Sequence, residues 1–207
     1  VFFTLGILQI ILGLSMIVPI LAQFFYDQID SGFISSGVVT IIFGVLFFLS
    51  NLDHGKKLTL PQAFLLTALS WLSIAIFGSL PFIFSEIELS VTDAFFESMS
   101  GITTTGSTII TNLEETPKAI LLWRAMLQWL GGIGIIVMAI TLMPIMNIGG
   151  MQLFIISTSN TPEKILPKSK EISIRLILVY LTLTITCAVF YKIFGMGFFD
   201  SIVHSMT

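Results

Sequence analysis

Charged residues are scarce in this sequence. Of its 207 residues only 10% are charged, whereas 55% are hydrophobic and the mean hydropathy is +1.01. A chain with so little polar surface cannot cover a water-facing globule, so the composition indicates a lipid bilayer as its solvent. The formal net charge of -3 also provides no basic field for a nucleic acid, which excludes that class of partner.

Residues that support catalysis or metal binding are equally few. The sequence has one cysteine, Cys187, inside an apolar run, and two histidines, His54 and His204, in separate regions. A single cysteine forms no intrachain disulfide, and this set offers no metal-ligand or nucleophile–base arrangement. We therefore expect neither an enzyme nor a covalent cofactor, and we expect Cys187 to make lipid or packing contacts.

Long apolar runs are abundant. A helix needs about 20 mostly apolar residues to cross the hydrocarbon core, and five stretches meet or approach that length: 1–25, 33–52, 62–85, 119–146 and 172–194. The sequence therefore predicts an all-α polytopic membrane protein. The first stretch lacks the basic region and cleavage site of a signal peptide, so we do not interpret it as one. The chain begins in the middle of an apolar stretch and ends directly after a segment that looks incomplete, so we expect a fragment.

The loops between these stretches sort their charges. Asp27 and Asp30 occupy the first connection, and acids also dominate the third. The second and fourth connections are basic, with His54, Lys56, Lys57, Lys164, Lys168, Lys170 and the nearby Arg175. Because basic loops face the cytoplasm, we expect the second and fourth connections inside and the first and third outside.

The third connection, 86–118, contains an apolar segment, 94–100, that is helix-compatible but far too short to span a membrane. Such a segment is typical of a re-entrant helix, and Ser90 or Thr92 could cap its start. In 101–106, which follows, two glycines bracket a β-branched stretch that favours extended backbone. Irregular backbone at membrane depth persists only beside protein or a water-filled cavity, so 98–106 is a candidate pore lining.

An internal repeat supports this interpretation. Residues 93–100 align without gaps on 200–207, and the spans that begin near 62 and 172 are offset by about the same amount. The repeating unit is then span, pore helix, filter and span. We expect this organisation: two additional N-terminal transmembrane helices in 1–53; a first repeat in 54–150, with its pore helix at about 92–101 and its filter at 102–107; and a cytoplasmic loop with a truncated second repeat in 151–207, with its span at 172–194 and its pore helix at about 198–207.

The chemistry of the loop fits a cation. A potassium ion that has shed its water needs a ring of oxygens, and extended backbone ending in glycine can align successive carbonyls along one axis. Thr103, Thr104, Thr105 and Gly106 meet this need. A preceding helix that ends at Ser100 would also direct its partly negative C-terminus toward the pore centre.

Three longer stretches carry a family resemblance: FFESMSGITTTGS at 95–107, LWRAMLQWLGGIGII at 122–136 and GGMQL at 149–153. They closely resemble the Trk/Ktr potassium-uptake family, in particular its TrkH-type pore-forming membrane subunit. The resemblance implies potassium-channel-like span–pore helix–filter–span repeats, four in one chain, around a pseudo-fourfold pore. It also implies two extra spans in front, which 1–53 would supply.

For the site, the resemblance implies potassium coordination by the backbone carbonyls of Thr103 and Thr104, with Thr105 and Gly106 completing the filter. Gly101, Ile102 and Ser107 would support it. The family also implies potassium as the transported ion, a location in the bacterial inner membrane, a homodimer and a cytoplasmic nucleotide-binding regulatory subunit of the TrkA type. The alternative is a non-conducting scaffold or sensor that retains the fold.

Three further residues have two interpretations each. Arg124 could order or repel cations at the pore mouth, or pair with Glu97, Glu114 or Glu115, because an arginine in a membrane helix needs a partner or a route to the interface. Glu97 could tune the potential at the mouth or be an ordinary solvated acid. His204, at the position of Glu97 in the second copy, could titrate near neutral pH or serve in packing.

Overall fold

The computed structural model describes residues 1–27, 29–51, 59–87, 89–146 and 165–207, and all regular structure in these ranges is helical. The all-α class predicted from the sequence is therefore confirmed. The chain divides into two compact units, Val1–Trp129 and Leu130–Met206, which are described separately below.

Five helical segments are long and apolar enough to cross a membrane, as the sequence predicted: Phe2–Phe25, Gly32–Leu49, Pro61–Phe84, Lys118–Ile136 and Glu171–Ile193. Two of these spans are interrupted. The first consists of α1 (Phe2–Ser15) and α2 (Ile17–Phe25), and the third consists of α4 (Leu60–Gly78) and α5 (Leu80–Phe84).

Prolines explain the two interruptions, which the hydropathy of the sequence did not predict. Pro19 and Pro81 lie just after the breaks at Met16 and Ser79. A proline has no N–H to donate, and its ring clashes with the carbonyl four residues earlier, so the helical hydrogen bonding fails at that point. Each span therefore contains a break in its helical hydrogen bonding within the membrane-length segment.

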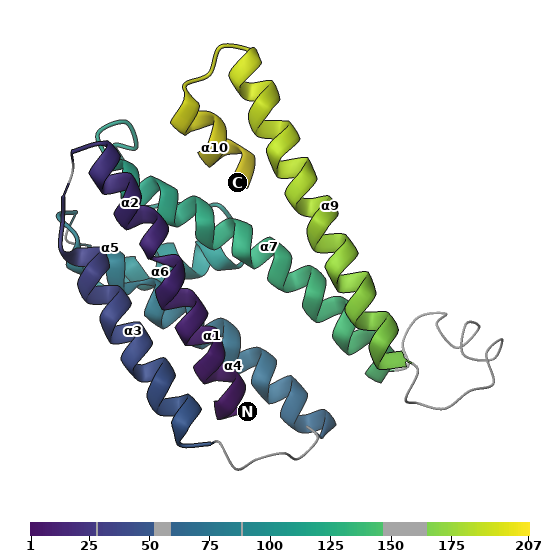
Figure 1. Cartoon of the computed structure of the whole chain (residues 1–207). Helices are drawn as coiled ribbons and strands as arrows, with labels where there is room; N and C mark the ends of the chain where they lie inside the picture. The colour runs from purple at the N-terminus through teal and green to yellow at the C-terminus, as the bar shows by residue number, and fades with distance from the viewer. Residues whose placement is uncertain (28, 52–58, 88, 147–164) are drawn as a thin grey trace. The chain divides into compact units, whose positions relative to one another are not determined.

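In the first unit, α1 and α3 (Gly32–Leu49) run antiparallel and side by side (Figure 1). Glycine permits this approach: a Cβ atom at Gly6 would lie 2.6 Å from the backbone nitrogen of Phe48 and 2.7 Å from the carbonyl oxygen of Gly44. Small residues commonly allow such backbone contact between membrane helices. Helix α1 also contacts α4, where the Gln9 amide nitrogen donates to the Ser73 hydroxyl at 2.5 Å.

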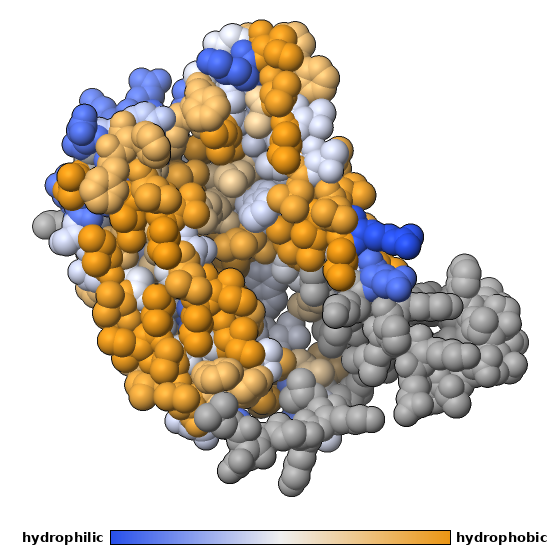
Figure 2. Space-filling view, viewed as in Figure 1, coloured by the Kyte–Doolittle hydropathy of each residue, from blue (hydrophilic) through white to orange (hydrophobic). Residues whose placement is uncertain are grey.

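Large apolar side chains cover the outer faces of these helices, and Figure 2 shows the resulting hydrophobic surface. Those exposed on the first three helices include Ile11, Leu14, Val18, Leu21, Val38 and Ile42. A water-soluble monomer rarely exposes so wide an apolar patch. The outer face is therefore suited to lipid, as the five membrane-length segments also indicate.

The short helix α6 (Val91–Ile102) packs against α4 and α5. Ser90 caps it: the Ser90 hydroxyl accepts a hydrogen bond from the backbone N–H of Asp93 at 3.2 Å, which decides between the two caps that the sequence allowed. With 12 residues, α6 is too short to cross the bilayer. It is followed by α7 (Lys118–Met146), whose first turns bury Trp123 and Leu127 in the same core.

The second unit contains the remainder of α7, α9 (Ile165–Ile193) and α10 (Phe198–Met206). A Cβ atom at Gly132 would lie 2.7 Å from the Tyr180 hydroxyl, so this glycine allows α9 to approach α7. The His204 ring on α10 meets the Tyr191 ring edge-on, with the ring centroids 6.4 Å apart. His204 thus makes the packing contact that was one of its two interpretations.

Several of the basic residues that predicted the orientation lie outside this description. His54, Lys56, Lys57, Lys164 and the 149–153 motif fall outside the described residues. The assignment of the second and fourth connections to the cytoplasm therefore stays a prediction.

Candidate functional site

Helix α6 ends in a left-handed cap. The N–H of Thr104 donates to the carbonyl of Gly101 at 2.9 Å, and the N–H of Thr105 donates to the carbonyl of Ser100 at 3.0 Å. This pair of bonds places residue 104 in the left-handed region, a position usually occupied by glycine or asparagine. Here it is a threonine with φ of +57°.

Thr104 is a backbone outlier because its branched side chain disfavours positive φ. Left-handed backbone costs a residue with a side chain about 1–2 kcal/mol. Such conformations persist only where surrounding contacts hold them, and they cluster at binding sites. The loop is therefore under local strain at the position for which the sequence predicted an ion contact.

The loop beyond this cap is exposed from Thr103 to Ile109. The Thr103 hydroxyl donates to the carbonyl of Met99 at 2.7 Å and lies 2.8 Å from the Thr105 hydroxyl. Gly106 has φ of +77°, and a Cβ atom there would meet nothing closer than 3.9 Å. The positive φ at position 106 therefore explains why glycine is needed there, since the surrounding space would admit a side chain.

The irregular backbone begins later than the sequence indicated. Extended structure was expected from residue 101, but Gly101 and Ile102 are the last, buried residues of α6. A Cβ atom at Gly101 would lie 3.0 Å from the Cβ of Leu127. Gly101 thus allows α6 and α7 to pack closely, and the helix continues two residues past Ser100 because that packing outweighs the low helix propensity of glycine.

Glu97 lies in the middle of α6 and has no exposed surface. Its carboxylate Oε1 forms an ion pair with Nε of Arg124 on α7. Of the three carboxylates that the sequence left open as partners of Arg124, the structure selects this one, since Glu114 and Glu115 are exposed. The interpretation of Glu97 as a solvated acid is wrong, because tertiary packing encloses it.

The same two side chains also bind residues 106–109, which form the returning limb of the loop. An Arg124 Nη donates to the carbonyl of Gly106 at 2.7 Å and to that of Ser107 at 3.3 Å. The other oxygen of Glu97 accepts the N–H of Ile109 at 3.1 Å. Backbone groups on residues 106–109 are therefore bound by one buried ion pair.

Ser100 adds a contact that the sequence did not reveal. Its hydroxyl donates to the carbonyl of Ser107 at 2.6 Å, across the base of the loop. The repeat predicted from the sequence contained a signal, because Ser100 aligns with Thr207 and both residues have a hydroxyl. Its significance required knowledge of where the returning limb lies.

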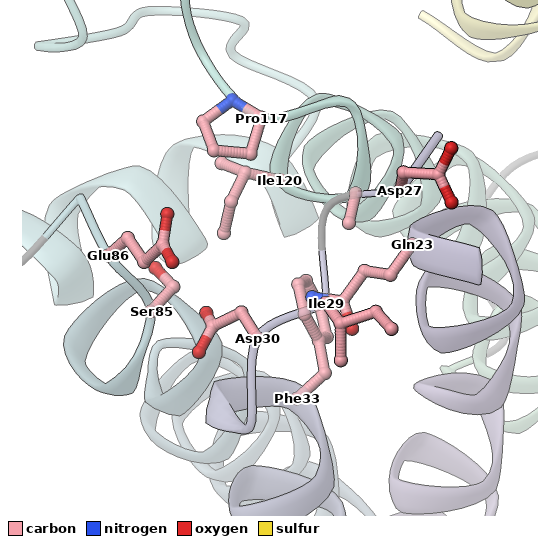
Figure 3. A pocket seen from close by; sticks show the side chains of 10 residues that line it. Gln23, Asp27, Ile29, Asp30, Phe33, Ser85, Glu86, Pro117 and Ile120 are labelled. Carbon is pink, nitrogen blue, oxygen red and sulfur yellow. The ribbon is translucent and has the colours of Figure 1, made fainter. Parts of the chain in front are cut away.

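A separate cavity of about 260 Å³ lies where the ends of α2 and α5 meet the starts of α3 and α7. Figure 3 shows Asp30 and Glu86 on one side of this cavity and Asp27 on the other. No residue of the Thr103–Gly106 loop lines it. Among the described residues, no three histidine, cysteine or acidic side chains are close enough together to hold a metal ion.

Comparison with known proteins gives consistent matches. The family model "TrkH: Cation transport protein" matches residues 29–206. The Trk system potassium uptake proteins TrkH of Halomonas elongata and of Escherichia coli K12 are each 40% identical to this chain, over 98% and 97% of it. The crystal structure of the potassium transporter TrkH from Vibrio parahaemolyticus superimposes on the whole chain with a TM-score of 0.87 at 38% identity.

The relatives are longer than this chain. The chain spans 43% of the length of the Halomonas protein and 42% of the Escherichia protein and of the Vibrio structure. It corresponds to less than half of each of them.

Proposed function

Since this chain belongs to the TrkH family of cation transport proteins, we propose that it contributes part of a pathway for potassium uptake across the bacterial cell membrane. In this proposal the loop after α6 is one quarter of a selectivity filter. Backbone carbonyls of Thr103 and Thr104 coordinate the ion, and Thr105 and Gly106 complete the filter. Gly101, Ile102 and Ser107 support it from the helix and the returning limb.

The observation that carries the proposal is the strained, exposed loop at the C-terminal end of a short, half-buried helix. Carbonyls at the end of a helix carry partial negative charge, which favours a cation. Thr104 and Gly106 both have positive φ, on either side of Thr105. A regular helix or strand would hold the carbonyls in its own hydrogen bonds, whereas this loop leaves backbone oxygens available for a ligand.

The partners of the proposed uptake system rest on the family alone. Names of the relatives refer to a Trk system and to potassium uptake. We propose potassium as the transported ion with no covalent cofactor, a homodimer, and a cytoplasmic regulatory subunit of the TrkA type that binds nucleotides. On the orientation predicted from the basic loops, that subunit meets the side of the second and fourth connections.

A non-conducting scaffold or sensor is the second candidate, because a fold can persist after its transport function is lost. The two candidates differ in one measurable property. A transporter restores growth of a bacterial strain that lacks potassium uptake, on medium low in potassium, whereas a scaffold does not.

The decisive experiment expresses the complete protein in such a strain and compares wild type with Gly106→Asp. We expect rescue by wild type and none by the variant, because aspartate at a φ of +77° strains the loop and adds a side chain to it. Equal rescue by both would exclude the filter assignment, and failure of the wild type would favour the scaffold.

A matched pair isolates the cause. Alanine at Gly106 or at Gly134 meets no atom closer than 3.9 Å, but only Gly106 has a positive φ. We therefore expect Gly106→Ala to impair rescue and Gly134→Ala to leave it unchanged.

A further inference from the structure

The ion pair between the fully buried Glu97 and the partly buried Arg124 is also hydrogen-bonded to the loop after α6. Each partner also binds the backbone of the returning limb: Arg124 binds the carbonyls of Gly106 and Ser107, and Glu97 binds the N–H of Ile109. Buried charges are expensive unless every donor and acceptor finds a partner. Here those partners are backbone groups of the loop.

The helix itself does not require the acid. In the second copy the position of Glu97 is occupied by His204, and α10 forms a short helix with this histidine in it. The His204 Nδ1 lies 2.8 Å from the carbonyl oxygen of Asp200, within its own helix. The carboxylate at position 97 is therefore explained by the loop that it binds, not by formation of the pore helix.

The guanidinium of Arg124 also affects how well the Gly106 carbonyl can bind a cation. It accepts a hydrogen bond from a guanidinium nitrogen at 2.7 Å, and a positive charge at that distance opposes the approach of a second cation to the same oxygen. The Gly106 carbonyl is thus a poor ligand for a cation, and in the proposed filter Gly106 contributes its backbone conformation. The carbonyls of Thr103 and Thr104 have no such cationic neighbour among the interactions described.

We infer that Glu97 and Arg124 are positioning residues that set the geometry of this filter quarter and thereby its discrimination between potassium and sodium. This inference rests on the proposed potassium uptake. In it Arg124 fixes the direction of the Gly106 and Ser107 carbonyls, and Glu97 fixes Arg124 and the N–H of Ile109. Neither side chain contacts the ion; both act through the backbone.

The test exchanges the two charges. In the double variant Glu97→Arg with Arg124→Glu, the ion pair can form again, but a carboxylate at position 124 cannot donate to the Gly106 and Ser107 carbonyls. A purely structural ion pair is restored by the exchange, whereas a positioning role is not. Arg124→Lys serves as a milder variant, because an ammonium keeps the charge but lacks the planar fork that reaches both Glu97 and the loop.

The measurement uses the complete protein, purified and reconstituted in liposomes, with potassium and sodium uptake recorded separately. We expect the potassium-to-sodium uptake ratio to fall about tenfold or more in both variants. Uptake is normalised to the amount of folded protein, so that a loss of stability alone leaves the ratio unchanged. Asp93→Asn, which removes an exposed acid of the same helix, is the matched control and should keep the wild-type ratio.

The outcomes separate the two proposals. Wild type without potassium uptake overturns the proposed function and, with it, this inference. Wild type that takes up potassium selectively, together with Arg124→Lys and exchange variants of unchanged ratio, overturns only the inference. A lowered ratio in folded Arg124→Lys and exchange variants, with Asp93→Asn unchanged, supports it.

Discussion

The indole N–H of Trp123 donates a hydrogen bond to the carbonyl oxygen of Gly78 at 2.9 Å, inside the protein core. It links α7 to the end of α4, which are the two spans on either side of α6. The carbonyl of Gly78 lies in the last turn of its helix, where backbone acceptors lack intrahelical partners. The Trp123 side chain therefore provides a hydrogen-bond donor for the Gly78 carbonyl, which the break at Ser79 leaves without a helical partner.

Trp123→Phe tests this link. Phenylalanine keeps most of the buried ring but removes the donor, which leaves a buried carbonyl without a partner. We expect the free energy of unfolding in detergent to fall by about 1–3 kcal/mol. Trp71→Phe, at a half-buried position of α4, should change it less; equal losses in the two variants would contradict the role of the hydrogen bond.

Thr104→Gly separates stability from function. Glycine adopts the left-handed conformation without the steric penalty, so we expect the thermal unfolding temperature to stay the same or rise. Potassium-over-sodium discrimination should fall, because glycine gives the backbone at position 104 more conformational freedom and the loop carbonyls are then less firmly oriented. Thermal unfolding and separate potassium and sodium uptake check the two parts. A variant with wild-type discrimination would show that the strained threonine is dispensable.

The contact between α1 and α3 is tested by two glycines. Gly6→Ala places a Cβ atom 2.6 Å from the backbone of Phe48, whereas Gly37→Ala places one 3.5 Å from its nearest atom. Because backbone cannot move aside as a flexible side chain does, we expect Gly6→Ala to destabilise the protein by about 1–3 kcal/mol. Gly37→Ala should be nearly neutral. Denaturation of both variants in the same detergent measures the difference.

Ser90→Ala tests the start of α6. The substitution removes the oxygen that accepts the N–H of Asp93, and loss of such a cap costs about 1 kcal/mol. The control is Ser35→Ala, since the exposed Ser35 hydroxyl donates to the carbonyl of Ser31, the residue before its own helix. Thermal unfolding that ranks the two variants equally would contradict the importance of this cap.

Length and hydropathy were sufficient to predict the spans. The five segments and the short helix follow from how many apolar residues a bilayer requires, a property that each stretch carries by itself. The breaks at Met16 and Ser79 were less accessible, because the stretches stay apolar across them. Pro19 and Pro81 were visible in the sequence, but prolines are also tolerated inside membrane helices.

The loop after α6 could be located from its residues, whereas its support was only partly predictable: Arg124 was expected to pair with an acid, but three carboxylates were candidates. Glu97 and Arg124 are 27 residues apart, and no local sequence pattern indicates that these two side chains form an ion pair. Burial of Glu97 depends on how α6, α7 and the returning limb pack together. The left-handed threonine was similarly inaccessible, since residue type alone favours extended backbone at that position.

The predicted repeat, in which α6 corresponds to α10, has an evolutionary consequence. At the matching positions, α6 has an acid, Glu97, and α10 has a histidine, His204. In a homo-oligomeric pore, one amino-acid substitution changes every subunit, and therefore every segment that lines the pore, at once. When the repeats belong to a single chain, each pore-lining segment can be substituted independently. Evolution can then change the chemistry of one segment while the other segments keep theirs.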